Sequence, residues 1–265
     1  MLSRPVVMGI LNTTPDSFYA GSRVAAVDEA VRRAEHMLAD GAAILDVGGY
    51  STRPGAAEVS EAEETARVAP VVEAVVQRFP QAVVSVDTFR ASVADAALQA
   101  GAQMVNDVSG GADARMFETV ARWQVPYVLM HSRGTPQTMT QLTQYTDLLG
   151  EIAVFFLEKL QQIRRAGIKD VILDVGFGFA KTIDQNYHLL NNLADFQIIG
   201  LPLLVGISRK SMIHKRLGIT AEEAMNGTTV LNTLALTKGA SILRVHDVKA
   251  AVEAVALYSL TKGKP

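Results

Sequence analysis

The stretch AGIKDVILD (166–174) combines a helix end, a glycine, a short apolar strand and a terminal carboxylate. The same order recurs in DGAAILDV (40–47), AGAQMVND (100–107) and KGASILRV (238–245). Glycine readily adopts the left-handed conformation that closes a helix, which predicts four helix ends, at Gly41, Gly101, Gly167 and Gly239. Each unit therefore predicts a buried parallel strand that directly follows a helix.

The remaining apolar runs extend this alternation over the whole chain. Strands are predicted at 5–10, 43–47, 82–86, 103–106, 126–130, 170–174, 201–205 and 241–245. Helices are predicted at 25–39, 61–78, 90–99, 113–122, 145–166, 184–194, 209–238 (broken) and 247–260. Ser60 and Glu63 have the spacing of a capping box at the start of the second helix.

Eight strand–helix units in 265 residues indicate an α/β fold, a single-domain (β/α)₈ TIM barrel over residues 1–265. The alternative is a doubly wound open sheet, which usually has fewer strands and often a glycine-rich turn after the first. Here the first strand runs into Asn-Thr-Thr-Pro (12–15) instead. The stretches 12–23 and 48–57 are rich in glycine and proline, and we expect them to be long loops at the active-site face.

The composition narrows the class of protein. The net charge of −2 gives no basic field, so we expect no nucleic-acid or membrane partner. The chain has no cysteine, which excludes disulfides and thiolate sites. The apolar run Val6–Leu11 is too short for a signal peptide or a membrane span. We therefore expect a cytoplasmic protein.

Polar residues stand where the predicted strands end, and in a barrel these ends meet at one mouth. They are Asn12, Asp46, Asp87, Asn106, Asp107, His131, Asp174, the run Ser208–Lys210, Arg244 and His246. A single strand-end carboxylate is often only a cap or loop anchor, and Asp46 is interpreted as a brace for the Gly48–Gly49 loop. So many polar ends together favour a functional site, since buried polar groups are costly unless they are paired.

The last two strand ends indicate an anion site. Loops after strands seven and eight commonly bind phosphate in this fold. Here they carry Ser208, Arg209, Lys210, Ser211, Arg244 and His246, which suit phosphate or pyrophosphate. The alternative is that Arg209 or Arg244 pairs with Asp174 or Asp247.

Asp87, Asn106 and Asp174 indicate a second partner, a flat heterocycle such as a guanine or a pterin, because these groups both donate and accept hydrogen bonds. Metal binding is the competing role. Asn12 could supply an oxygen ligand to Mg²⁺, which completes its coordination with waters and substrate phosphates. No HExxH zinc motif occurs in the sequence.

Two long segments, MGILNTTPDSF (8–18) and DVGGYSTRPGA (46–56), resemble the signature segments of the dihydropteroate synthase family. SVDTFRASVA (85–94), NDVSGG (106–111), DVGFGFAKT (174–182), GISRKSMI (206–213) and RVHDV (244–248) continue the resemblance in the family's order. The similarity covers essentially the whole chain. It implies the condensation of 6-hydroxymethyl-7,8-dihydropterin pyrophosphate with p-aminobenzoate to give 7,8-dihydropteroate and pyrophosphate, by a cytosolic homodimer.

The resemblance also implies roles for individual residues. Asp87, Asn106, Asp174 and Lys210 match residues that hold the pterin, and Met130, Phe179 and Gly206 match positions that line its pocket or rim. Asn12, Arg244 and His246 match the pyrophosphate and Mg²⁺ site, with Asn12 as the metal ligand. Thr52, Arg53 and Ser211, with Lys210, match the p-aminobenzoate region. The expected catalytic residues are Asp87, Asp174, Lys210 and Arg53.

The sequence departs from the family pattern at three places. Tyr50 stands where many members have Glu, Ala20-Gly21-Ser22 replaces a frequent Asp-Gly-Gly, and Val175 replaces a common Pro. The competing functions are a pterin-binding methyltransferase domain, a non-catalytic pterin-binding paralogue and a Schiff-base aldolase that uses Lys210. The clusters at 208–211 and 244–246 and the Thr-Arg-Pro-Gly loop (52–55) favour the synthase over the methyltransferase.

Overall fold

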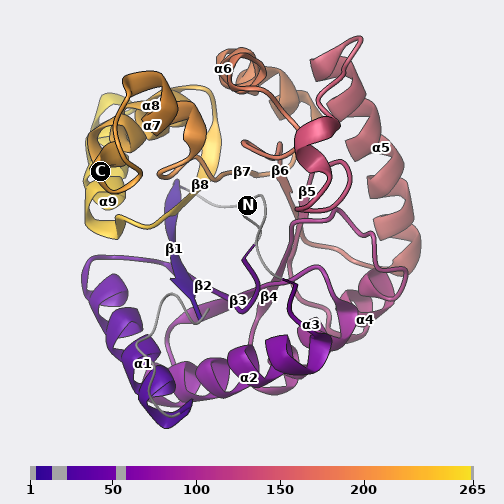
Figure 1. Cartoon of the computed structure of the whole chain (residues 1–265), viewed down its shortest axis with the longest axis vertical. Helices are drawn as coiled ribbons and strands as arrows, with labels where there is room; N and C mark the ends of the chain where they lie inside the picture. Colours follow the sequence, from indigo (N-terminus) through magenta and orange to yellow (C-terminus); the bar gives the residue numbers. More distant parts are fainter. Residues whose placement is uncertain (1–3, 14–22, 52–57, 264–265) are drawn as a thin grey trace.

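The protein is a closed barrel of eight parallel strands in the order β1 to β8, surrounded by helices (Figure 1). The structure is a computed structural model of the chain, and it describes residues 4–13, 23–51 and 58–263. Each strand is hydrogen-bonded to the next in sequence, and β8 closes the barrel on β1. The predicted TIM barrel is confirmed, and the open sheet is excluded.

The eight strands lie where the apolar runs predict them. Their bounds are β1 (Val6–Asn12), β2 (Ile44–Gly48), β3 (Val83–Asp87), β4 (Met104–Asp107), β5 (Tyr127–Met130), β6 (Val171–Asp174), β7 (Leu203–Val205) and β8 (Ala240–Val245). The prediction differs most at the start of β7, where Leu201 and Pro202 precede the strand, and at the end of β1, which continues to Asn12.

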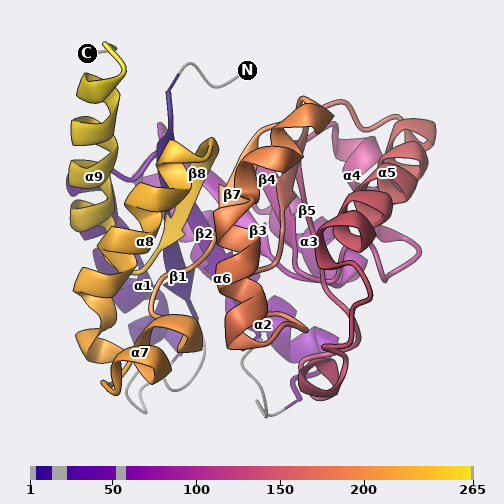
Figure 2. The same ribbon diagram turned by 90° about the horizontal axis from the view of Figure 1, so that it is seen from above.

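Helices cover the outside of the barrel. They are α1 (Arg23–Ala39), α2 (Glu61–Arg78), α3 (Ala91–Gln99), α4 (Met116–Trp123), α5 (Leu148–Ala166), α6 (Ile183–Asn191), α7 (Ser211–Leu217), α8 (Met225–Thr237) and α9 (Val248–Thr261). The side view places α8 and α9 on one side of the barrel and α5 on the other (Figure 2). No helix in the described ranges combines the length and the apolar character that a bilayer crossing requires.

The predicted helix ends are confirmed in detail. Gly41, Gly101, Gly167 and Gly239 all have positive φ angles, of 97°, 107°, 88° and 94°. The Ser60 hydroxyl accepts a hydrogen bond from the Glu63 backbone N–H at 3.2 Å, as a helix N-cap does. The Glu63 carboxylate instead accepts from Arg67, so Ser60 forms an N-cap in place of the predicted reciprocal capping box.

The strands separate two apolar layers because successive side chains point to opposite faces. Outward residues such as Leu45, Val105 and Leu173 pack under the helices in the main core. A smaller cluster fills the barrel interior, with one residue from each of seven strands: Met8, Ile44, Met104, Val128, Ile172, Leu204 and Ile242. The candidate site lies directly above this inner plug.

Candidate active site at the carboxyl ends of the strands

The site is the layer of inward residues directly above the inner plug. Two residues after each plug residue, the same inward direction brings Ile10, Asp46, Asn106, Met130, Asp174, Gly206 and Arg244, of which Gly206 directly follows β7, and Asp87 joins them from the end of β3. Asn12 and His246 follow two residues later on β1 and after β8. The barrel geometry therefore gathers most of the predicted site residues at one mouth.

A hydrogen-bonded group of side chains crosses the mouth between strands that are far apart in sequence. Arg244 Nε donates to Asp46 Oδ2 at 2.6 Å, and Arg244 Nη2 donates to Asp87 Oδ2. Asn106 Nδ2 donates to the same Asp46 oxygen at 2.9 Å. The carboxylates offset the unfavourable burial of Arg244 and raise the pKa of its guanidinium above the ordinary value.

The interpretation of Asp46 as a loop brace is wrong. Its side chain is fully buried inside the mouth and bonds to Arg244 and Asn106. The Gly48–Gly49 segment is held by other groups: Thr13 donates twice to the Gly48 carbonyl, at 2.8 and 3.1 Å, and Arg67 donates to the Gly49 carbonyl at 3.0 Å.

The carboxyl of Asp87 has a raised pKa. Burial raises its pKa well above the ordinary value, and the guanidinium of Arg244 only partly offsets that effect. Repulsion from the carboxylates of Asp46, Glu64 and Asp107 acts in the same direction as burial. A perturbed carboxyl in a cleft is typical of functional sites.

Asp174 and Lys210 form the opposite side of the mouth. The Gly176 N–H donates to Asp174 Oδ1 at 2.7 Å, and Lys210 Nζ donates to the Phe177 carbonyl. The ammonium of Lys210 also lies 4.6 Å from the centre of the Phe179 ring. Burial lowers the pKa of Lys210 to about 8, against the opposing attraction of Asp174.

The run Ser208–Lys210 divides its side chains between two directions. Arg209 has a positive φ of 56°, which is uncommon for a residue other than glycine. Its guanidinium forms a two-pronged ion pair with Asp247, at 3.0 and 2.6 Å. The alternative of pairing with Asp247 is thus correct for Arg209, and Lys210 is the cation of this run that faces the mouth.

Ser208 and His246 connect the loops that follow β7 and β8. The Ser208 hydroxyl lies 3.0 Å from His246 Nδ1 and accepts from the His246 backbone N–H at 3.1 Å. Ser211 is the first residue of α7, directly after Lys210. These groups occupy the part of the mouth where the fold commonly binds phosphate.

Two of the polar strand ends turn away from the mouth, which corrects the prediction that all of them converge. Asp107 accepts from the Tyr127 hydroxyl at 2.7 Å and from the Ser109 and Gly111 backbone, so it anchors the loop after β4. His131 follows the inward Met130 and lies 3.0 Å from Lys181 Nζ. Burial lowers the pKa of His131 to about 2, so the imidazole is neutral.

Lys181 is a structural part of the site that the sequence analysis missed. Besides His131 Nδ1, its ammonium contacts the carbonyls of Gly176 and Phe179, at 3.0 and 3.1 Å. Burial lowers its pKa to about 7. Lys181 thereby fixes the loop between β6 and α6, and its sequence position between Ala180 and Thr182 gave no signal of this role.

Two predicted p-aminobenzoate residues are not described by the structure, and two departures from the family pattern are buried. Thr52 and Arg53 lie outside the described residues. Tyr50, one of the departures from the family pattern, is nearly buried and packs edge-on against Phe89 with ring centres 5.1 Å apart. Val175, another departure, is fully buried.

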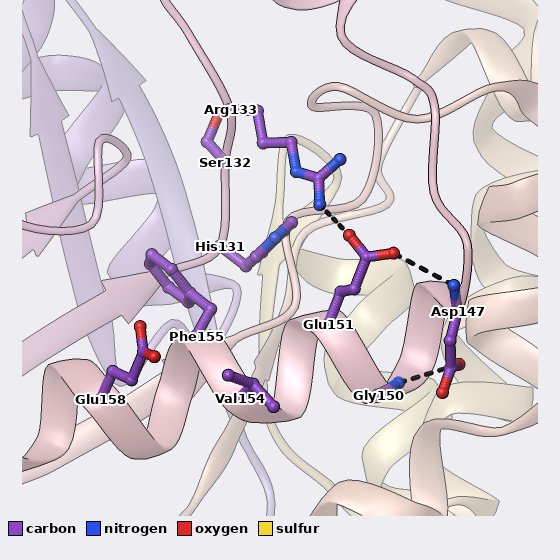
Figure 3. A pocket seen from close by; sticks show the side chains of 9 residues that line it. All are labelled: His131, Ser132, Arg133, Asp147, Gly150, Glu151, Val154, Phe155 and Glu158. Carbon is purple, nitrogen blue, oxygen red and sulfur yellow. Dashed lines mark hydrogen bonds and ion pairs between the residues drawn. The ribbon is translucent and has the colours of Figure 1, made fainter.

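A separate hollow of about 480 Å³ lies beside α5, outside the ring of inward residues (Figure 3). It is lined by His131, Ser132, Arg133, Asp147, Gly150, Glu151, Val154, Phe155 and Glu158. An ion pair between Arg133 and Glu151 spans part of it. None of the inward residues of the mouth lines this hollow, so it is distinct from the candidate site.

The residues present are compatible with a weakly held Mg²⁺ ion. The described ranges contain no group of three or more His, Cys, Asp or Glu side chains placed to hold a metal. Mg²⁺ often takes only one or two protein oxygens and completes its shell with water and substrate phosphates. The half-buried amide of Asn12, at the end of β1, fits such a single-ligand site.

The fold and its mouth define a TIM-barrel enzyme with buried carboxylates, an amide and a buried ammonium at the carboxyl ends of the strands. Residues 8–246 match the family model described as pterin binding enzyme. The *Escherichia coli* (strain K12) dihydropteroate synthase is 45% identical over 262 residues, covering 98% of this chain and 93% of the relative.

Solved structures agree with the sequence match. The *Yersinia pestis* dihydropteroate synthase with a sulfonamide drug complex superposes with a TM-score of 0.94 at 44% identity, covering 99% of this chain and 96% of that one. The *Xanthomonas albilineans* dihydropteroate synthase in complex with 7,8-dihydropteroate gives 0.89 at 36% identity, covering 100% and 96%. The chain belongs to the dihydropteroate synthase family of pterin-binding enzymes.

Proposed function

We propose that this chain condenses 6-hydroxymethyl-7,8-dihydropterin pyrophosphate with p-aminobenzoate, and that it releases 7,8-dihydropteroate and pyrophosphate. The observation that carries the proposal is the ring formed by Asp87, Asn106, Asp174 and Lys210 above the inner plug. Its support is the membership of the family and the bound 7,8-dihydropteroate in the *Xanthomonas* relative.

The ring suits the pterin because its groups complement a heterocycle edge with several donors and acceptors. The carboxylates of Asp87 and Asp174 accept hydrogen bonds from N–H groups. The Asn106 amide nitrogen donates to Asp46, so the amide oxygen of Asn106 remains available to accept a hydrogen bond from a ligand. Met130 pairs with Asp174 in the strand ladder, and Gly206 lies beside Arg244, so both stand next to these groups.

The reaction proposed for this site is a displacement in which the bond to pyrophosphate breaks early. The electron-rich pterin ring stabilises the positive charge left on the carbon, and the carboxylates of Asp87 and Asp174 stabilise it further. The amine of p-aminobenzoate then attacks that carbon. No covalent enzyme intermediate is required, so Lys210 acts through its charge and hydrogen bonds.

The departing pyrophosphate needs positive charge and hydrogen-bond donors on the side of the mouth formed after β7 and β8. Lys210, Ser211 and His246 stand there, and Arg244 lies at the centre of the mouth. Asn12 is the residue proposed to hold Mg²⁺ together with the substrate's phosphates. When bound, Mg²⁺ would neutralise charge that grows on the leaving group. Thr52 and Arg53 remain the residues expected to bind p-aminobenzoate.

The proposed assembly is a homodimer, and an apolar face on α8 and α9 supports it. The exposed side chains there include Val230, Leu234, Leu257 and Leu260. A groove of about 400 Å³ runs between the two helices. Contiguous apolar surface on a folded domain commonly marks a protein interface.

A turnover assay tests the proposed function. Purified protein is incubated with the pterin pyrophosphate, p-aminobenzoate and Mg²⁺, and dihydropteroate is followed by mass together with released pyrophosphate. We expect product that depends on both organic substrates, that is lost in Lys210→Ala and that persists in Lys249→Ala, which removes an exposed lysine of α9. Tight pterin binding without product would refute the synthase and identify a non-catalytic paralogue.

A further inference from the structure

We propose that Asp46 is a positioning residue of the active site, which holds the guanidinium of Arg244 and the amide of Asn106 in the orientation that receives the pterin. The inference rests on the proposed function and extends it to a residue that is not among those proposed to bind the substrates. It is drawn from hydrogen bonds that cross the interior of the barrel.

The bonds made by Asp46 are tertiary contacts between strands that are not neighbours. In the strand ladder, Asp46 of β2 stands beside Ile10 of β1 and Ser85 of β3. Its carboxylate instead reaches Arg244 on β8, at 2.6 Å, and Asn106 on β4, at 2.9 Å. A single oxygen, Oδ2, accepts both bonds, so the two partner side chains converge on one point.

The burial of Asp46 is costly if the residue serves stability alone. Its side chain is completely buried, and Oδ1 has no hydrogen-bond partner within the described part of the chain. A buried carboxylate with an unsatisfied oxygen destabilises a fold relative to a well-packed apolar side chain. The preceding inward residue of β2 is the apolar Ile44, so the barrel accommodates such a residue at this strand.

Asp46 is one of two carboxylates that share the positive charge of Arg244, and Asp87 is the other. The guanidinium donates to both Asp46 and Asp87, so its Nε and Nη2 atoms are oriented by two separate carboxylates. Without the Asp46 charge, Asp87 would be the only carboxylate among the described residues that is hydrogen-bonded to Arg244. The guanidinium would then lose the contact that orients its Nε, and the Asn106 amide would lose the charged acceptor that fixes which of its atoms faces the pterin.

This arrangement gives a readout in the pH dependence of the reaction. The charged groups that face Asp87 are Arg244 from β8, Asp46 from β2, Glu64 from α2, Asp107 from β4 and Lys210 from the start of α7. The carboxylate of Asp46 repels the ionised form of Asp87. It also competes with Asp87 for the positive charge of Arg244. Both effects raise the pKa of Asp87. Neutralising Asp46 therefore lowers that pKa, whereas a substitution that keeps a carboxylate at this position leaves it in place.

The test is Asp46→Asn, which keeps the shape and removes the charge. We expect kcat/KM for the pterin pyrophosphate to fall at least about tenfold, as for a lost charge-assisted hydrogen bond. We also expect the acid limb of its pH profile to move to lower pH. Ser85→Ala is the matched control, because Ser85 is equally buried on the neighbouring strand and its hydroxyl has no partner in the described ranges. It should leave the profile in place.

Asp46→Glu provides a second variant that retains the charge. We expect a reduced kcat/KM with the acid limb at its wild-type position, because the carboxylate is displaced but not removed. If Asp46→Asn fails to fold, Asp46→Glu carries the test, with thermal unfolding as the check on its integrity. A folded Asp46 variant with the wild-type kcat/KM would overturn the proposal.

The proposed function and this inference fail in different ways. Wild-type protein without turnover would refute the synthase, and pterin affinity measured by fluorescence titration would still test Asp46. Wild-type turnover with an Asp46→Asn variant of unchanged pterin affinity, kcat/KM and pH profile would refute the role of Asp46 alone.

Discussion

Lys210 illustrates how burial adjusts the charge of a single side chain. Its ammonium is held by the Phe177 carbonyl, the Phe179 ring and the attraction of Asp174, yet burial lowers its pKa to about 8. The group is charged at neutral pH and loses its proton under mildly alkaline conditions. Binding of an anionic substrate favours the charged form, so the pKa should rise in the complex.

This state predicts an alkaline limb in the pH profile. Deprotonation of Lys210 removes the charge that binds the anion, so kcat/KM for the pterin pyrophosphate should fall above pH about 8. The limb in kcat should lie at higher pH, because bound substrate stabilises the ammonium. Steady-state rates from about pH 6 to pH 10 measure both. A kcat/KM that stays level up to about pH 9.5 would contradict the prediction.

At the scale of single residues, sequence reasoning succeeded where the backbone alternation alone decides orientation. Asp87, Asn106 and Asp174 end apolar strands and point inward, as predicted. It failed for Asp46 and Lys181, whose partners are set by tertiary contacts. Asp46 bonds to a residue 198 positions away, and Lys181 to one 50 positions away. No local pattern reports such a pair.

At the scale of elements, the loop between β6 and α6 owes its shape to one buried ammonium. Lys181 contacts two carbonyls of this loop and the imidazole of His131, and the neighbouring Ala180 has a positive φ of 48°. The loop carries Phe177 and Phe179, which contact Lys210. The Lys181 contacts therefore help to set the position of Lys210, a residue proposed to take part in the reaction.

Lys181→Met should loosen this loop. The change leaves the Gly176 and Phe179 carbonyls without their donor, which should cost about 3 kcal/mol of unfolding free energy. Amide hydrogen exchange should speed up over residues 176–179, and KM for p-aminobenzoate should rise. Lys169→Met, at an exposed position before β6, is the control. Unchanged exchange in this loop would count against the role of Lys181.

The elements themselves were largely predictable. Glycines at helix ends and apolar runs of strand length are local signals, and they located all eight strands. The break in the predicted helix 209–238 is explained by Gly218, which closes α7 in the left-handed conformation before α8 begins at Met225. The exact start of β7 depends on pairing with β6 and β8, which the sequence does not display.

At the scale of the whole molecule, the two sides of the barrel differ in a way that bears on assembly. Exposed apolar side chains occur on α8 and α9, and others, including Leu157, occur on α5 on the opposite side (Figures 1 and 2). The proposed dimer uses the α8–α9 face, where the exposed Leu257 lines a groove between the two helices.

Leu257→Glu should weaken the proposed dimer because it places a charge on that face. We expect the molar mass from light scattering to change from dimer to monomer at concentrations where the wild type is dimeric. Leu157→Glu is the matched control, since it places the same charge on an exposed leucine of α5. A wild-type monomer, or equal effects of the two substitutions, would exclude the α8–α9 face as the interface.

In the proposed function, the inward polar side chains at the carboxyl ends of the strands bind the pterin. β6 offers a direct test, because Asp174 stands at its carboxyl end in the mouth and the exposed Asp170 precedes its amino end. The decisive measurement is the dissociation constant of the pterin pyrophosphate for Asp174→Asn and Asp170→Asn.

We expect Asp174→Asn to weaken binding by about 100-fold, as when a buried charged acceptor of hydrogen bonds is lost. Asp170→Asn should bind as tightly as the wild type. Equal affinities of the two variants, or a loss confined to Asp170→Asn, would contradict the placement of the pterin at this mouth.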